Sequence, residues 1–142
     1  MEAVENNDIR SFNVGASDYA THKYQSWDFW IRFRLNSFDA DLSKRTLRIK
    51  DGDGRALDYK KIKHICGERL RQLDTPEGDQ LPAPFLDFED PIGELAVMLN
   101  DYTQLTEIDA WIMHDIILET DRRQAYTSII GYCDERLAQL EA

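Results

Sequence analysis

The sequence predicts an all-α fold, and three observations lead to this prediction. Apolar residues recur every three or four positions through most of the chain, which is the spacing of one helix face. Capping signatures precede several of these segments. Few segments alternate polar and apolar residues with the period of two that is typical of strands. We therefore expect a compact domain of five to six helices.

The first expected helix begins near Ser26 and ends before a break at Asn36-Ser37. Its apolar face combines Trp27, Trp30, Ile31 and Leu35. A second helix follows, for which Ser37 or Asp39 is a suitable N-cap. The buried side expected for this second helix contains Leu42, Leu47 and Ile49.

A turn and a long third helix are expected next. Residues 51–54 read Asp-Gly-Asp-Gly and predict a turn, because Gly tolerates positive φ and Asp bonds to nearby backbone. The third helix should run from about Leu57 to Leu73. Its apolar stripe is Ile62, Ile65, Cys66, Leu70 and Leu73. Residues 74–90 hold three of the four prolines and predict a loop between two helical layers.

Three more helices are expected in the second half. Asp90 followed by Pro91 is typical of a helix start, and this helix should reach about Asn100. Thr106 and Asp109 approximate a capping box for a helix that ends near Glu119. Residues 121–124 resemble another such start, and the last helix should continue to the C-terminus. The stripe of that helix is Tyr126, Ile129, Ile130, Cys133, Leu137 and Leu140.

Composition sets the class of protein. With 142 residues, 42% of them apolar, the chain can form a single domain over residues 17–142, preceded by a polar arm at 1–16. No apolar run approaches the roughly 18 residues that span a bilayer, and the acidic first residues show no secretory signal. Two distant cysteines indicate reduced, buried thiols. We therefore expect a cytoplasmic protein.

Charge is distributed unevenly along the chain. The formal net charge is −10, yet residues 17–73 hold thirteen of the seventeen Lys and Arg side chains. Residues 76–142 hold three basic and fifteen acidic side chains. The negative total argues against general binding to DNA or RNA, which needs an extended positive surface. A small basic pocket suits a small phosphorylated ligand better, and the uneven charge could also steer homo-oligomer formation, with the last helix as the expected contact.

The most basic segment predicts where such a ligand would bind. Lys44 and Arg48 are four residues apart and share a helix face. Asp58 and Lys61 share a face of the next helix, so an antiparallel pair of helices would bring all four together. Arg binds phosphate with a planar fork and Lys adds a point charge. Possible surfaces for base stacking are Tyr19, Tyr24, Trp27, Trp30 and Tyr59.

Three motifs carry a resemblance to a known family. Residues 22–28 read HKYQSWD, residues 38–48 read FDADLSKRTLR, and residues 57–65 read LDYKKIKHI. Over residues 18–72 the chain resembles small phage-encoded domains described as SaV-like or phage nucleotide kinase-like. Ser26 and Ala40 depart from the Pro and Gly usual in that family, and residues 48–53 depart from its R-x-G-K-K run. The family positions carried over as ligand-binding residues are His22, Gln25, Asp28, Lys44, Arg48, Asp58 and Lys61.

The resemblance implies a nucleotide-binding protein of a phage, active in the infected bacterial cytoplasm. If the protein is a nucleoside monophosphate kinase, the basic side chains of the predicted pocket would hold the phosphates, and Asp28 or Asp58 would face Mg²⁺. The chain has no G-x-x-x-x-G-K-[ST] phosphate loop, so binding without turnover is the alternative. Such a protein could sequester a mononucleotide or cyclic nucleotide signal of host defence. A protein–protein adaptor is a third possibility.

Other constellations predict no site. His64, His114, Asp115 and Asp134 follow the order of a metal phosphohydrolase, but a two-letter HD match has little weight, and we expect no metal site there. The Asp-Gly-Asp-Gly run lacks the Gly and Glu that an EF-hand needs at its sixth and twelfth positions.

Overall fold

The computed structural model describes residues 23–142, and every regular element in that range is a helix. This confirms the all-α class. Seven helices lie within these residues, compared with the five to six expected, because the predicted loop contains the four-residue helix α5 (Pro76–Asp79). No helix in residues 23–142 is both long enough and apolar enough to cross a bilayer.

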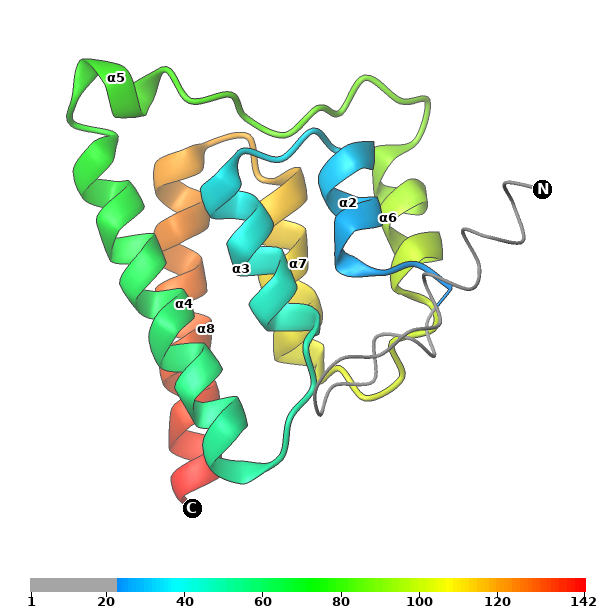
Figure 1. Cartoon of the computed structure of the whole chain (residues 1–142), viewed down its shortest axis with the longest axis vertical. Helices are drawn as coiled ribbons and strands as arrows, with labels where there is room; N and C mark the ends of the chain where they lie inside the picture. The colour runs from blue at the N-terminus through cyan, green and yellow to red at the C-terminus, as the bar shows by residue number, and fades with distance from the viewer. Residues whose placement is uncertain (1–22) are drawn as a thin grey trace.

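The helices form two layers of three, which Figure 1 shows. The first layer is α2 (Ser26–Arg32), α3 (Ser37–Leu47) and α4 (Gly52–Gln72). The second layer is α6 (Pro91–Leu99), α7 (Glu107–Leu118) and α8 (Arg122–Glu141). Between the layers α4 packs on α8 and α3 packs on α7, while an ion pair of Arg32 with Glu94 joins α2 to α6. The core therefore lies between two consecutive halves of the chain.

Residues 80–90 cross from the first layer to the second over one end of both (Figure 1). The Phe85 backbone N–H donates to the Phe33 carbonyl at 2.7 Å. The Asn36 side chain donates to the Pro82 carbonyl at 3.0 Å. These bonds hold an irregular segment against the C-cap of α2 and the N-cap of α3, and they give two of its backbone polar groups a partner.

The predicted starts of the last three long helices are confirmed. Asp90, Thr106 and Asp121 each accept a hydrogen bond from the backbone N–H three residues further on, at 3.0, 3.1 and 3.1 Å. The Asp109 carboxylate accepts from the Thr106 backbone N–H at 3.0 Å, which completes the capping box. Each bond satisfies an N–H that the first turn of a helix leaves without a partner.

Two predicted boundaries in the first half are wrong. The side chain that caps α3 belongs to Asn36, which accepts from the Asp39 N–H at 2.9 Å, so Asp39 lies inside the helix. Residues 52–54 are the first turn of α4 instead of a separate turn. Gly is compatible with helical φ, and Asp53 in that first turn is favoured by the helix dipole.

The buried face of α2 also differs from the predicted stripe. Phe29 and Phe33 are fully buried, whereas Ile31 is 75% exposed and Trp27 is 39% exposed. The seven residues of α2 make only two turns, so a few contacts determine which face is buried. Phe29 packs on Tyr102, and Phe33, four residues later, packs on Phe88. The stripe of α8 is mainly used inside the chain, against α4 and α7. The expected homo-oligomer stays a prediction.

Candidate functional site

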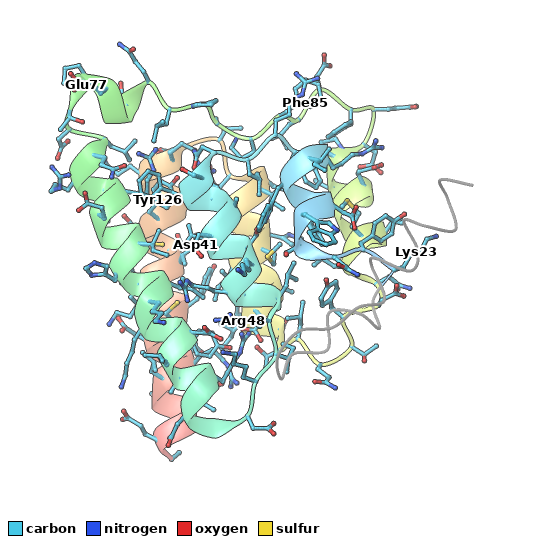
Figure 2. The ribbon with its side chains drawn as sticks, in the orientation of Figure 1. Lys23, Asp41, Arg48, Glu77, Phe85 and Tyr126 are labelled. Carbon is cyan, nitrogen blue, oxygen red and sulfur yellow. The ribbon has the colours of Figure 1, made fainter. Side chains whose placement is uncertain are left out.

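The corner between α3 and α4 holds three charged side chains of the basic segment. Arg45 and Arg48 come from the end of α3, and Asp58 comes from the second turn of α4. Arg48 Nη2 donates to Asp58 Oδ1 at 2.9 Å, and Arg45 Nη1 lies 3.7 Å from the same oxygen. Figure 2 labels Arg48 at the end of α3 that lies beside α4. We call Arg45, Arg48 and Asp58 the corner cluster.

In the corner cluster Asp58 is buried, the two arginines are half-buried, and the hydrogen bonding is incomplete. The Asp58 side chain is 2% exposed, and its second oxygen, Oδ2, accepts no hydrogen bond within the part of the chain described. The Nε–H group of Arg48 is buried as well and has no acceptor there. A buried polar atom without a partner costs about 1–3 kcal/mol, and native proteins have few such atoms. Among the described residues, the corner cluster therefore has an unused hydrogen-bond donor beside an unused acceptor.

The other predicted site residues are distributed around this corner or away from it. Lys44 is half-buried on α3, and Lys61 is exposed on α4. His22 lies outside the described residues. Gln25 is buried at the N-cap of α2.

Asp28 serves α2 itself. Its Oδ2 accepts from the Gln25 backbone N–H at 2.8 Å. The Asp28 side chain also lines a hollow between α2 and α6, whereas Arg48 and Asp58 lie between α3 and α4. The structure therefore brings Arg48 and Asp58 together. The ligand contacts carried over for Gln25 and Asp28 stay predictions.

A second charged group lies next to the corner, between α4, α7 and α8. The Asp109 carboxylate forms an ion pair with Arg55 Nη2 at 3.0 Å and accepts a hydrogen bond from the Tyr59 hydroxyl. The Tyr59 hydroxyl oxygen accepts a hydrogen bond from Arg136 Nε at 3.1 Å. We call these four residues the Asp109 cluster. Burial, with a smaller contribution from the Asp109 contact, raises the pKa of Tyr59 to about 12. Tyr59 is fully buried, so it offers no surface for base stacking.

Arg55 ties the Asp109 cluster to the corner cluster. Its guanidinium donates to the carbonyls of Arg45, Thr46 and Arg48 at 2.9, 2.9 and 3.2 Å. These carbonyls end α3, where the helix dipole favours a cation. Arg55 thereby fixes the position of Arg45 and Arg48 relative to α4.

A third charged group lies at the opposite end of α3. Asp39 Oδ1 accepts from the Tyr126 hydroxyl at 2.6 Å, and Asp39 Oδ2 accepts from Arg122 Nη2 at 3.1 Å. Arg69 Nε donates to the Tyr126 hydroxyl at 3.2 Å. We call Asp39, Arg69, Arg122 and Tyr126 the Asp39 cluster. It joins α3, α4 and α8.

Desolvation dominates the titration of the Asp39 cluster. Burial raises the pKa of Asp39 above its ordinary value, and Arg122, Tyr126 and Arg69 oppose that shift in part. Burial and the neighbouring Asp39 carboxylate likewise raise the pKa of Tyr126. Sequence reasoning missed this cluster, although Arg69 follows Cys66 by three residues and so lies on the apolar stripe of α4.

Metal and thiol chemistry find little support among the described residues. No three His, Cys, Asp or Glu side chains in residues 23–142 are close enough together to hold a metal ion. His64 and His114 are exposed, and Asp134 pairs with Lys63 at 2.5 Å. Cys66 and Cys133 are free and fully buried, as predicted, and burial raises the pKa of both thiols.

In comparisons with known proteins, no family model matches the chain, and no curated protein or solved structure matches it. The resemblance to phage nucleotide kinase-like domains therefore stays a prediction, and the function has to be argued from the site.

Proposed function

We propose that this chain binds a small phosphorylated nucleotide at the corner cluster. The observation that carries the proposal is a pair of buried atoms, Arg48 Nε and Asp58 Oδ2, that have no hydrogen-bond partner among residues 23–142 and lie beside a second arginine. One is a donor and the other an acceptor, which matches a ligand that presents phosphate oxygens on one side and hydroxyl or amino groups on the other.

Each residue has a role that follows from its chemistry. Arg48 would donate its Nε–H to a phosphate oxygen, and Arg45 would add positive charge from the next position on α3. Lys44 and Lys61, predicted from the sequence, would supply charge from α3 and α4. Asp58 Oδ2 would accept a hydrogen bond from a sugar hydroxyl or a base amino group.

Binding without turnover is the form of this function that the corner favours. Two arginines engage Asp58, so its charge is compensated by protein cations and is poorly suited to recruit Mg²⁺. A protein that sequesters a nucleotide signal fits this arrangement better than a nucleoside monophosphate kinase. The phage setting of such an activity rests on the resemblance over residues 18–72.

A thermal-shift screen of the whole chain against mononucleotides, dinucleotides and cyclic nucleotides tests the proposal. A ligand that binds only the folded state raises Tm, by an amount equivalent to about 2.7 kcal/mol at a concentration of 100 Kd. The double variant Lys44→Ala with Arg48→Ala should lose that shift. The matched control is Lys63→Ala with Arg71→Ala, which removes one Lys and one Arg from surface pairs of α4 and should keep it.

Circular dichroism of both double variants establishes that the fold is intact, and Asp58→Asn provides a milder second test of the same site. If no nucleotide raises Tm, or if the Lys44→Ala, Arg48→Ala variant still responds, the proposal fails.

Turnover is tested separately by incubating a bound monophosphate with ATP and Mg²⁺. Formation of ADP and a diphosphate would show a kinase, and unchanged nucleotides would support sequestration.

A further inference from the structure

Helix α6 exposes an apolar face to solvent. Its sequence PIGELAVML is dominated by apolar residues, and only Leu95 and Met98 are buried. Ile92 and Val97 are each 62% exposed. On the neighbouring helix α2, Ile31 is exposed to 75%. Isolated exposed apolar residues are ordinary, but aliphatic side chains gathered on adjoining helices indicate a contact surface.

Three adjoining hollows surround this face, with volumes of about 420, 430 and 500 Å³. Tyr24 lines two of them, Val97 lines two, and Arg32 and Glu94 line another pair together. Because they share these walls, the hollows form one surface feature that follows α6 and the adjacent side of α2. We call this feature the α6 groove.

The rim of the α6 groove is acidic. Two cations and five carboxylates line the three hollows, a net of three negative charges: Lys23, Arg32, Asp28, Glu89, Asp90, Glu94 and Asp101. Arg32 is already paired with Glu94, so one of the two cations is compensated within the groove. The groove thus combines an aliphatic floor with a negative potential.

We propose that the α6 groove docks a basic amphipathic helix of another protein. Aliphatic residues of that helix, repeating at i, i+3, i+4 and i+7, would pack on the exposed side chains of Ile31 and Val97. Its Lys and Arg side chains would lay their stems along the apolar surface and reach the carboxylates of the rim.

Charge complementarity distinguishes this partner from the other occupants. Residues 1–22 of the chain carry four acidic side chains and one arginine, so they would place negative charge against a negative rim. A symmetric contact between two copies through this groove would set the same carboxylates against each other. A basic helix is the occupant whose charge and apolar pattern both match the groove.

The test uses the full chain and a synthetic peptide of about 14 residues, with Leu at the helical stripe positions and Lys elsewhere. Fluorescence anisotropy measures its binding. Two comparison peptides keep the length: in one Glu replaces Lys, and in the other the same Leu and Lys residues are shuffled to remove the stripe. We expect the striped Lys peptide to bind at least about tenfold more tightly than either, because only it satisfies both charge and apolar pattern.

The variant Ile31→Lys with Val97→Lys should weaken binding of the striped peptide by about tenfold or more. Its matched control, Leu57→Lys with Leu140→Lys, changes two exposed apolar residues on α4 and α8 and should change binding less than about twofold. Equal binding of all three peptides, or unchanged binding by the groove variant, would overturn the proposal. So would sedimentation showing a wild-type dimer that this variant converts to monomer, because the groove would then belong to a second copy.

Discussion

Asp39 and Asp58 are both buried carboxylates that face arginines, yet their hydrogen bonding differs. Asp39 is fully buried, and both of its oxygens have donors: Tyr126 on one side, Arg122 and Asn36 on the other. Asp58 is 2% exposed, and one of its two oxygens has no donor within residues 23–142. The two sites lie near opposite ends of α3.

The difference separates a structural role from a binding role. A network whose every member is satisfied rigidifies the core and gains nothing from a ligand. A network with an unpaired donor and an unpaired acceptor is stabilised by any molecule that supplies both. The Asp39 cluster therefore holds three helices together, while the corner cluster is the better candidate for recognition. Substitutions of the charged residues test this contrast.

Asp39→Ala should have the largest effect on stability. It removes the partner of Arg122 and Tyr126 in a dry environment, and breaking a buried pair in this way costs about 3–5 kcal/mol. Urea denaturation followed by circular dichroism measures the loss. Asp41→Ala is the control, since Asp41 is 42% exposed and pairs with Arg45 on one helix, and it should cost less than about 1 kcal/mol. A loss below about 1 kcal/mol for Asp39→Ala would contradict the structural role.

Asp58→Ala should cost less, about 1–2 kcal/mol. The side chains of Arg45 and Arg48 are 21% and 23% exposed. Water can therefore replace part of the hydrogen bonding that the carboxylate provides. The same denaturation experiment ranks the two variants. If Asp58→Ala were the more damaging of the two, the corner would be as structural as the Asp39 cluster.

Asp115→Asn tests how a third carboxylate, Asp115, makes stability depend on pH. Burial, and then Glu119 nearby, raises the pKa of Asp115 from 3.8 to about 6. The folded state therefore binds this proton more tightly than the unfolded state does. The contribution of the protonated Asp115 to the free energy of unfolding is fully present below about pH 4 and is lost as pH rises through 6. Tm of Asp115→Asn relative to wild type should rise between pH 4 and 7. The side chain is only partly buried, so we expect less than about 1 kcal/mol. A constant difference across that range would contradict the shift.

Arg71→Ala should have the smallest effect. Arg71 donates to Glu68 at 2.5 and 3.1 Å, but both side chains are exposed on α4. Solvent screening leaves such exposed ion pairs little net contribution to the free energy of unfolding. Denaturation in low and high salt measures the loss, and a loss as large as that of Asp39→Ala would show that surface pairs rival the buried clusters.

Local features of the fold could be predicted from the sequence. The starts at Asp90, Thr106 and Asp121 were found because an N-cap and its N–H partner lie three residues apart. The meeting of Arg48 and Asp58 was expected as well, since both helices could be recognised and the short connection makes them antiparallel.

Features that depend on distant residues could not be predicted in this way. Asp39 meets Arg122 and Tyr126 across 83 and 87 positions, and no local pattern marks a buried charge whose partner is so remote. The face of α2 was misassigned for a related reason. Its two turns carry apolar residues on both sides, and contacts with Phe88 and Tyr102 determine that Phe29 and Phe33 are buried. The unpaired atoms of the corner are also visible only once the helices are packed.

Helices α4 and α8 are longer than the helices beside them. They have 21 and 20 residues, about 30 Å each, whereas α3 and α7 have 11 and 12, about 17 Å. One end of the α4–α8 pair therefore extends past the second pair, as Figure 1 shows. Backbone amides at the start of α4 and the end of α8 should consequently exchange with deuterium soonest, while those around Cys66 and Ile129 should exchange only on global unfolding.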